Sequence, residues 1–413
     1  MGLWTTRMLA ALDNGVTGGK WYSLMDKVTA PRALAAAWKR VAANKGAAGV
    51  DGISIMRFKA RATHYLAALA RDLRAGRYQP LPARRVHIPK GQGKTRPLGI
   101  SAVKDRMVQT AVQLVLAPIF ERDFLPCNYG FRPGRGCKDA LREVDRWLKA
   151  GYTWVVDVDV EQYCDAIPKA PLLARVADKV SDGTLLDLVQ RFLNQDILEG
   201  MRQWSPLAGV PQGSGLSPLL SNLYVHPLDR VVSHAGYVIV RYCDDLVLLC
   251  RTHADAAAAL ALVQTWMAQH GLRLHPEKTR IVDGRKGGEG FDFLDYRFAG
   301  GRRYVRPKSL QGLRDKIRHH TGRTRSGSLA QIIAELNPLL RGWFGYFKHA
   351  RFTTFRDIDG FVRRRLRALL RKREKRPGFG RTPKDHQRWP NAFFAAQGLF
   401  TLQEAYERAR QSR

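Results

Sequence analysis

Two short apolar runs that enclose a pair of acidic residues form the most informative pattern along the chain. Residues 236–240 and 246–249 are rich in β-branched and aliphatic side chains, which predicts two buried strands joined by a tight turn at Asp244 and Asp245. Two adjacent carboxylates there repel each other and lose hydration unless cations bind them. A solvated turn is the plain interpretation, and a pair of Mg²⁺ ions serving phosphoryl transfer is the alternative.

A second apolar segment, residues 151–160, carries two further carboxylates. Alternation along a strand places Asp157 and Asp159 on one face and valines on the other. Because a strand with two carboxylates on one face is unsuited to a plain core, we expect it to supply a third ligand to the site of Asp244 and Asp245. Register favours Asp159, which leaves Asp157 the weaker candidate.

A basic hairpin is predicted in the first quarter of the chain. Alternation over residues 84–90 predicts a strand, and residues 91–93 (GQG) predict its turn. Lys90, Lys94 and Arg96 flank that turn. The hairpin is therefore either a triphosphate clamp, in which arginine supplies a bidentate fork, or an ordinary solvated hairpin.

Helices are expected between these strands. Ser101 is a candidate N-cap for one helix, and Ser217 followed by Pro218 is the start expected of another. Residues 254–271 are rich in alanine and leucine and predict a third helix. Residues 44–52 hold three glycines and an asparagine, which predicts an ordered loop.

Two further loops carry candidate contacts to nucleotides or nucleic acid. In residues 128–136, Arg132 and Arg135 either meet template phosphates or are solvated, and the charge of the chain favours the former. Residues 209–216 form a glycine-rich turn. Its backbone N–H groups and the amide of Gln212 suit close approach to a nucleotide.

Composition narrows the class of protein. The chain has 413 residues and is 45% hydrophobic, which is enough for two or three packed domains. It lacks an apolar run long enough for a membrane span and a signal-peptide pattern, so a cytoplasmic protein without membrane association is expected. The five cysteines show no CxxC spacing and predict reduced thiols.

Charge points to a polyanionic partner. Lys and Arg number 69 against 36 Asp and Glu, a net charge of +33, and residues 301–413 hold 28 basic against 8 acidic residues. Release of counterions from phosphates drives such a chain onto nucleic acid. Residues 361–376 predict a helix with a dense basic face, which suits RNA, with a membrane surface as the alternative. Aromatic rings in residues 336–347 are expected in the core, with base stacking as the alternative.

Taken in order, nine motifs resemble those of bacterial group II intron-encoded reverse transcriptase/maturases, in the form without an HNH endonuclease domain. They are NKGAAGVDG, RRVHIPK with RPLGI, YGFRPGRG, VDVD with CDAIP, GVPQGSGLSPLLSN, RYCDDLVLL, HPEKT, FDFL and LNPLLRGWFGYF. The resemblance spans nearly the whole chain. It implies an α+β fold, a right-hand polymerase with fingers and a palm built on an antiparallel sheet, followed by a helical thumb and maturase domain X. The implied domains are an N-terminal extension (1–60), fingers and palm (61–300), and thumb with domain X (301–413).

The resemblance also implies a function. The protein would be an RNA-directed DNA polymerase using two Mg²⁺ ions and dNTPs, and an RNA-binding maturase that assists group II intron splicing and mobility. Its partners would be structured intron or template RNA and a DNA primer or cDNA; its oligomeric state stays open. One alternative is a domesticated enzyme that serves phage defence or DNA repair with its own template RNA. Another is a splicing cofactor with an idle polymerase, against which the intact carboxylates argue.

Site residues follow from the matching motifs. The catalytic carboxylates fall on Asp159, Asp244 and Asp245, and Val160 belongs to the same metal site. Expected nucleotide-binding residues are Arg84, Lys90, Arg96, Tyr163, Cys164 and Gln212. Expected nucleic-acid-binding residues are Arg132, Arg135, Lys278, Arg341, Arg363, Arg364, Arg365, Arg367 and Arg371.

Three residues depart from the family pattern. Cys164 stands where the family has an aromatic ring that crowds the 2′-OH of the nucleotide, so exclusion of ribonucleotides is expected to be relaxed unless Tyr163 takes that role. The alternative is that Cys164 packs as a small buried side chain and sugar selection lies elsewhere. Cys243 replaces an alanine and Asp295 a glycine, and both are predicted to be packing changes.

Overall fold

A computed structural model of the protein describes residues 4–16, 18–91, 94–285 and 287–411, with the backbone alone for residues 90, 91 and 94. The chain forms two compact units. Unit 1 comprises residues 1–147 and 156–281, and unit 2 comprises residues 148–155 and 282–413. This division follows compactness, so the three domains expected from the resemblance stay a prediction.

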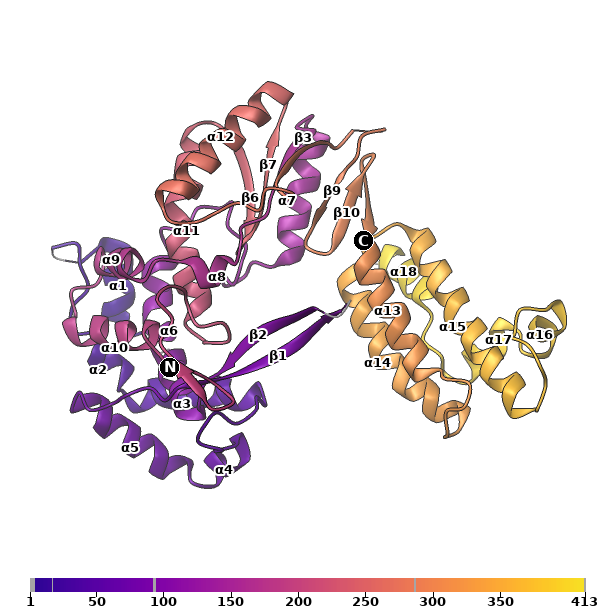
Figure 1. The fold of residues 1–413 in the computed structure, drawn as a ribbon, viewed down its shortest axis with the longest axis horizontal. Coiled ribbons are helices and arrows are strands. Elements are labelled where there is room, and N and C mark those ends of the chain that lie inside the picture. Colours follow the sequence, from indigo (N-terminus) through magenta and orange to yellow (C-terminus); the bar gives the residue numbers. More distant parts are fainter. Residues whose placement is uncertain (1–3, 17, 92–93, 286, 412–413) are drawn as a thin grey trace. The chain divides into compact units, whose positions relative to one another are not determined.

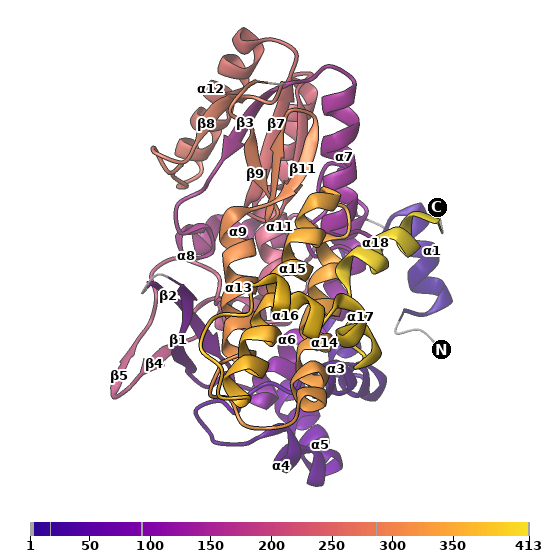
Figure 2. The same cartoon turned by 90° about the vertical axis from the view of Figure 1, so that its right-hand side faces the viewer.

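Unit 1 is mostly helical around one buried helix (Figures 1 and 2). Its helices are α1 (Thr6–Asn14), α2 (Met25–Val28), α3 (Pro31–Ala43), α4 (Ile55–Ala60), α5 (Ala62–Arg74), α6 (Val103–Glu121), α7 (Cys137–Lys149), α8 (Tyr163–Ala166), α9 (Lys169–Ala177), α10 (Gly183–Leu193), α11 (Ser217–His234) and α12 (His253–Gln269). Apolar side chains lie on nearly all sides of α6, which explains why α2, α3 and α11 all pack against it.

The predicted basic hairpin is present in a four-stranded sheet with the order β2-β1-β4-β5. The strands are β1 (Ala83–Gly91), β2 (Lys94–Ile100), β4 (Ile197–Glu199) and β5 (Arg202–Trp204). β1 and β2 pair antiparallel, with Val86 opposite Leu98 and Ile88 opposite Arg96. Of the predicted turn, residues 92–93 lie outside the described part of the chain.

The second sheet carries the acidic pair. Its order is β6-β7-β3-β8, formed by β6 (Val238–Tyr242), β7 (Asp245–Cys250), β3 (Trp154–Val158) and β8 (Arg280–Asp283). β6 and β7 form the predicted antiparallel hairpin, in which Tyr242 pairs with Asp245 and leaves Cys243 and Asp244 as the turn. α11 packs on β6 and α12 on β7, so both strands are largely buried.

Two predicted helix caps are wrong, although both helices exist. α6 begins at Val103 with Ala102 at the N-cap, and Ser101 lies outside it, buried. α11 begins at Ser217, whose hydroxyl donates to the Pro211 carbonyl at 2.7 Å. Ser217 therefore closes the preceding glycine-rich turn instead of capping its own helix.

Unit 2 joins a small sheet to a set of helices. The sheet, in the order β11-β10-β9, contains β9 (Phe291–Phe293), β10 (Tyr296–Ala299) and β11 (Arg302–Val305). The helices are α13 (Pro307–His320), α14 (Leu329–Phe347), α15 (Phe352–Arg373), α16 (Pro383–Arg388), α17 (Asn391–Ala396) and α18 (Leu402–Gln411). The predicted core position of the 336–347 aromatics holds for Phe344 and Phe347, which are buried.

Asp295 lies in the turn between β9 and β10. Its φ is +64° and that of Leu294 is +48°, so both residues are left-handed, a conformation that favours glycine or asparagine. The Asp295 carboxylate accepts a hydrogen bond from the Ser309 hydroxyl at 2.8 Å. Replacement of the family's glycine therefore acts on the turn backbone, which the prediction of a packing change left out.

The helices, together with sheets in which β1–β2, β4–β5, β6–β7 and β9–β10–β11 pair antiparallel and β1–β4 pair parallel, confirm the α+β class. All five cysteines are free thiols. Within the described ranges, none of the helices combines the length and the apolar character needed to cross a membrane.

Candidate active site

A polar cavity of about 520 Å³ in unit 1 brings together residues that are far apart in the sequence. Asp159 and Asp244 both line it, together with Arg96, Cys164 and Gln212. Val160, Tyr163 and Lys278 complete the set of predicted site residues at its wall. The volume lies in the range of small-molecule sites. Asp245 is not among the described residues that line the cavity.

Asp159 directly follows β3 and is held there by its backbone. The His275 N–H donates to the Asp159 carbonyl at 2.8 Å, and the Asp159 N–H donates to the Thr279 hydroxyl at 3.3 Å. The Lys278 ammonium lies 3.2 Å from Asp159 Oδ1. Lys278 was expected to contact nucleic acid; in this structure its partner is the Asp159 carboxylate.

Asp244 is exposed on the turn between β6 and β7, and Asp245 opens β7. The residue before them, Cys243, has a φ of +61°. A left-handed conformation costs a side-chain-bearing residue roughly 1–2 kcal/mol. Cys243 therefore occupies a strained turn position. Alanine would carry the same strain, so the replacement of the family's alanine by cysteine stays predicted to be a packing change.

The donor set at the cavity fits a hard divalent cation, because such ions prefer carboxylate oxygens. Among the described residues, however, no three His, Cys, Asp or Glu side chains meet as a ready metal-binding group. The Lys278 ammonium neutralises Asp159 instead, and both of these side chains are about half exposed. An exposed ion pair contributes at most about 1 kcal/mol, so a divalent cation can displace it.

A short polar relay runs along one wall of the cavity. Gln212 Nε2 donates to Asp165 Oδ2 at 2.9 Å, and Arg96 Nε donates to Gln212 Oε1 at 3.3 Å. Asp165 thus fixes the orientation of the amide that receives Arg96. Asp165 was not predicted, although an acidic residue directly after Cys164, near the Asp159 ligand, was a signal in the sequence.

The other predicted nucleotide-binding residues differ in their surroundings. Arg84 is half-buried and donates from Nη2 to the Ala48 carbonyl at 2.9 Å, which ties the 44–52 loop to β1. The side chain of Lys90 lies outside the described part of the chain. Both contacts to nucleotide stay predictions.

Tyr163 and Cys164 point to different environments. Tyr163 is buried, and its hydroxyl donates to the Ser221 carbonyl at 2.7 Å, so its ring is fixed and cannot swing to replace Cys164. Cys164 is half-buried at the cavity wall. Burial, reinforced by the Asp244 and Asp165 carboxylates, raises the pKa of Cys164 to about 11, so it remains a thiol.

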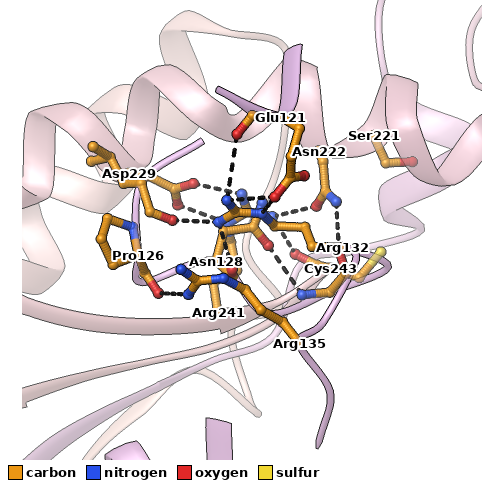
Figure 3. A network of polar contacts seen from close by, with 12 residues as sticks. Glu121, Pro126, Asn128, Arg132, Arg135, Ser221, Asn222, Asp229, Arg241 and Cys243 are labelled. Carbon is orange, nitrogen blue, oxygen red and sulfur yellow. Dashed lines mark hydrogen bonds and ion pairs between the residues drawn. The ribbon is translucent and has the colours of Figure 1, made fainter. Parts of the chain in front are cut away.

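Arg132 does not have the role predicted for it. Its side chain is 5% exposed, donates to the Glu121 carboxylate at 2.8 Å, and donates to two carbonyls of its own loop. A guanidinium enclosed in this way cannot reach a phosphate, so the predicted nucleic-acid contact is wrong. Arg135 donates to the Pro126 carbonyl at 2.8 Å but is only half-buried, and its contact with nucleic acid stays a prediction (Figure 3).

A second enclosed arginine, Arg241, donates to the carbonyl of Cys243, the residue before Asp244 (Figure 3). Arg241 and Asp229 form an ion pair with no exposed surface on either side chain. Sequence reasoning missed both, although an arginine inside the apolar run of β6 was a signal that it had a buried partner.

In unit 2, the arginines predicted to bind nucleic acid fall into two groups. Arg367 is buried and donates to the Trp389 carbonyl at 2.9 Å and to Asn391 Oδ1 at 3.0 Å, so its predicted contact with nucleic acid is wrong. Arg371 pairs with Asp385 at 2.5 Å, and Arg365 donates to Thr321. These side chains join helices and loops within unit 2.

The second group remains accessible. Arg364 and Arg318 lie over the Phe361 ring, 5.1 and 5.5 Å from its centroid. Burial, followed by repulsion from Arg381 and Arg318, lowers the pKa of Arg364. Arg341 is exposed over the Phe400 ring, and Arg363 is half-exposed. Clustered arginines on aromatic rings suit phosphates and unstacked bases.

Two family models match the chain. The model described as "Reverse transcriptase (RNA-dependent DNA polymerase)" matches residues 88–298, which include the cavity residues Arg96 to Lys278. The model described as "Group II intron, maturase-specific domain" matches residues 310–389, which include α14 and α15.

Similar proteins agree with these matches. Protein YkfC of Escherichia coli (strain K12) is 38% identical over 331 residues, covering 70% of this chain and 84% of YkfC. The group II intron-encoded protein LtrA of Lactococcus lactis subsp. cremoris is 35% identical over 204 residues, covering 48% of this chain and 33% of LtrA. The alignment with a solved telomerase structure from Candida albicans covers 84% of this chain and 69% of the telomerase chain, with 11% sequence identity and a TM-score of 0.44.

Proposed function

We propose that this chain, which belongs to the group II intron family of reverse transcriptase/maturases, copies RNA into DNA at the cavity around Asp244. We also propose that it assists intron splicing and mobility. Family membership gives it an RNA-directed DNA polymerase fold and activity, binding of RNA and DNA, and use of divalent metal ions. The observation that carries the site assignment is the meeting of Asp159 and Asp244 in one cavity with Arg96 and Gln212.

The carboxylates of Asp159, Asp244 and Asp245 would hold two Mg²⁺ ions. These ions, when bound, would make the primer 3′-OH a better nucleophile and neutralise charge on the leaving pyrophosphate. Arg96 contributes a guanidinium for the triphosphate, and the Asp165 to Gln212 contact keeps that arginine directed to the cavity wall. Lys278, which pairs with Asp159 at 3.2 Å, would have to release this carboxylate for it to bind a divalent cation.

Unit 2 supplies the second part of the proposed function. Arg364 and Arg341, over the rings of Phe361 and Phe400, form no ion pair with a carboxylate of the described residues, so their charge is available to RNA phosphates. The match of residues 310–389 to the maturase-specific domain favours intron RNA as the partner over a host role in defence or repair.

The polymerase assignment is tested by extension of a DNA primer on an RNA template with Mg²⁺ and dNTPs. Asp244→Asn should lower extension by about three orders of magnitude and leave RNA affinity within about twofold, because affinity comes from distributed charge. Asp187→Asn, a change at an exposed carboxylate of α10, is the matched control. Robust extension by Asp244→Asn contradicts the assignment.

The maturase assignment is tested by sequencing the RNA that copurifies with the protein. We expect a structured intron RNA, and the protein should accelerate splicing of a precursor that contains it. Enrichment of an unrelated RNA without an effect on splicing contradicts the maturase role and supports the host role instead.

A further inference from the structure

A buried ion pair between Arg241 and Asp229 lies beside Cys243, the residue before Asp244 (Figure 3). Arg241 Nε donates to Asp229 Oδ1 at 2.7 Å and Nη2 donates to Oδ2 at 2.5 Å. Burial lowers the pKa of Arg241, but attraction to Asp229 outweighs it and raises the pKa overall, so the guanidinium stays charged.

Stability alone does not account for this pair. Moving two charges out of water costs several kcal/mol per ion, and an apolar pair of similar volume is often as stable or more so. The remaining N–H groups of Arg241 show another use. Nη1 donates to the backbone carbonyl of Cys243 at 3.1 Å and to Asn222 Oδ1 at 3.0 Å. The ion pair thus holds the carbonyl that directly precedes Asp244.

Gly130 packs closely against the backbone of the same turn. A Cβ atom at this position would lie 2.5 Å from the Cys243 amide nitrogen, so only glycine permits the contact. Asn222 Nδ2 donates to the Gly130 carbonyl at 2.6 Å. The buried side-chain amide of Asn222 therefore connects Arg241, whose Nη1 donates to its Oδ1, with Gly130, whose carbonyl accepts from its Nδ2.

Cys243 needs this support because its backbone is left-handed, with a φ of +61°. Strained backbone persists only where the surrounding structure determines it by several contacts. The hydrogen bond to the Cys243 carbonyl, and the close packing of the Gly130 backbone that leaves no room for a Cβ near the Cys243 amide nitrogen, supply this support.

We propose that Arg241, Asp229 and Asn222 are positioning residues that fix the Cys243 backbone and thereby direct the Asp244 carboxylate into the cavity. This inference rests on the proposed function, because it takes Asp244 as a ligand of the divalent cation. Groups that orient a ligand affect metal affinity even when they never touch the metal.

The decisive variant replaces the ion pair by apolar side chains, Arg241→Met together with Asp229→Leu. It removes the donor to Cys243 without leaving an unpaired buried charge. We measure the thermal unfolding midpoint, the affinity for Mn²⁺ alone from the electron paramagnetic resonance signal of the free ion, and kcat and KM for primer extension. We expect cooperative unfolding, at least about a tenfold loss of Mn²⁺ affinity, a similar fall in kcat and an unchanged KM for primer–template.

The matched control is Tyr78→Phe, which removes a buried hydrogen bond of 2.6 Å to Asp105 in the same unit. It should lower the unfolding midpoint and leave Mn²⁺ affinity unchanged. A folded Arg241→Met/Asp229→Leu protein with natural Mn²⁺ affinity overturns the proposal.

Asn222→Ala decides the question if the double variant does not fold. It keeps the ion pair but removes the link to Gly130, so positioning predicts about a threefold loss of Mn²⁺ affinity. An unchanged affinity overturns the proposal. If instead the proposed function is wrong, the Asp244→Asn variant itself should extend primers and bind Mn²⁺ like the natural protein. The measurements on Asp244→Asn therefore distinguish this outcome from a failure of the positioning proposal.

Discussion

Arginine has opposite uses in the two units of this protein. In unit 1, Arg241 and Arg132 are enclosed, and their N–H groups bind carboxylates and carbonyls around the Asp244 turn and the loop beside it. In unit 2, Arg341 and Arg364 lie over aromatic rings at the surface. The same side chain therefore fixes backbone in one unit and supplies available charge in the other.

This difference separates two kinds of function. A metal-dependent reaction needs a few groups held in one geometry, so a single buried donor has a large effect. Affinity for a polyanion is a sum over many phosphate contacts, so a single surface charge has a small one. Mutations in unit 1 should therefore change the rate of synthesis, and mutations on the surface of unit 2 should change RNA affinity and its dependence on salt.

The largest effect is expected at Asp159. Asp159→Asn should lower primer extension by about three orders of magnitude, because it removes a carboxylate that lines the same cavity as Asp244. Asp157→Asn, two residues earlier in β3, is the matched control, because its carboxylate lies 3.8 Å from Arg280. We expect it to cost less than about fivefold. The reverse ranking, measured as kcat on one RNA template, would mean that Asp157 is the ligand.

The next effect concerns the accessible charge of unit 2. Replacing Arg341, Arg363 and Arg364 together by alanine should weaken RNA binding by about a hundredfold and lower the slope of log affinity against log salt by roughly one unit per lost phosphate contact. Filter binding between low and physiological salt measures both quantities.

Arg367→Met provides the contrast within the same helix. Because Arg367 is enclosed by Trp389 and Asn391, its loss should reduce the free energy of unfolding by about 1–3 kcal/mol and leave the salt slope unchanged. If the triple variant keeps the natural slope, the exposed arginines are solvated and RNA binds elsewhere.

A smaller effect is expected at the relay of the cavity wall. Asp165→Leu removes the acceptor that fixes the Gln212 amide, so Arg96 loses a defined acceptor. We expect the KM for dNTP to rise by about thirtyfold with a smaller change in kcat, because a hydrogen bond to a charged group contributes about 1.5–3 kcal/mol. Steady-state kinetics at saturating primer–template measures this. A KM within twofold of the natural value would show that the relay does not act on the nucleotide.

The hairpin of Asp244 could be predicted from the sequence because its signal is local. Short apolar runs on either side of two acidic residues are typical of paired buried strands with a polar turn, and β6 and β7 do form this pair. The turn itself lies at Cys243 and Asp244, one residue earlier than predicted, because Asp245 already pairs with Tyr242. Asp159 was found for the same reason. The order of the motifs along the chain then identified Arg96 and Gln212 as site residues, although no local sequence pattern relates them to the acidic residues.

Burial of polar side chains could not be predicted in this way. Arg132 and Arg367 stand in basic, polar segments, and only the folded chain shows that carbonyls from distant loops enclose them. The two serine caps failed for a related reason, since Ser217 has a stronger partner in Pro211 than in its own helix. The composition gives only the number of charged residues, whereas tertiary packing determines which charged side chains are exposed to solvent.

The smallest effect, and the one that tests the unusual cavity wall, is expected at Cys164. Its side chain lines the cavity beside Asp244, while Tyr163 is held in the core by its hydrogen bond to the Ser221 carbonyl. A phenyl ring at position 164 should fill space that a ribose 2′-OH needs, so Cys164→Phe should raise the ratio of dNTP to rNTP incorporation by about tenfold, or roughly 1.4 kcal/mol of discrimination. Cys164→Ser is the control, because it keeps the volume and should leave the ratio unchanged. An equal ratio in all three proteins would mean that Cys164 is only a small packed side chain and that sugar selection depends on another part of the cavity.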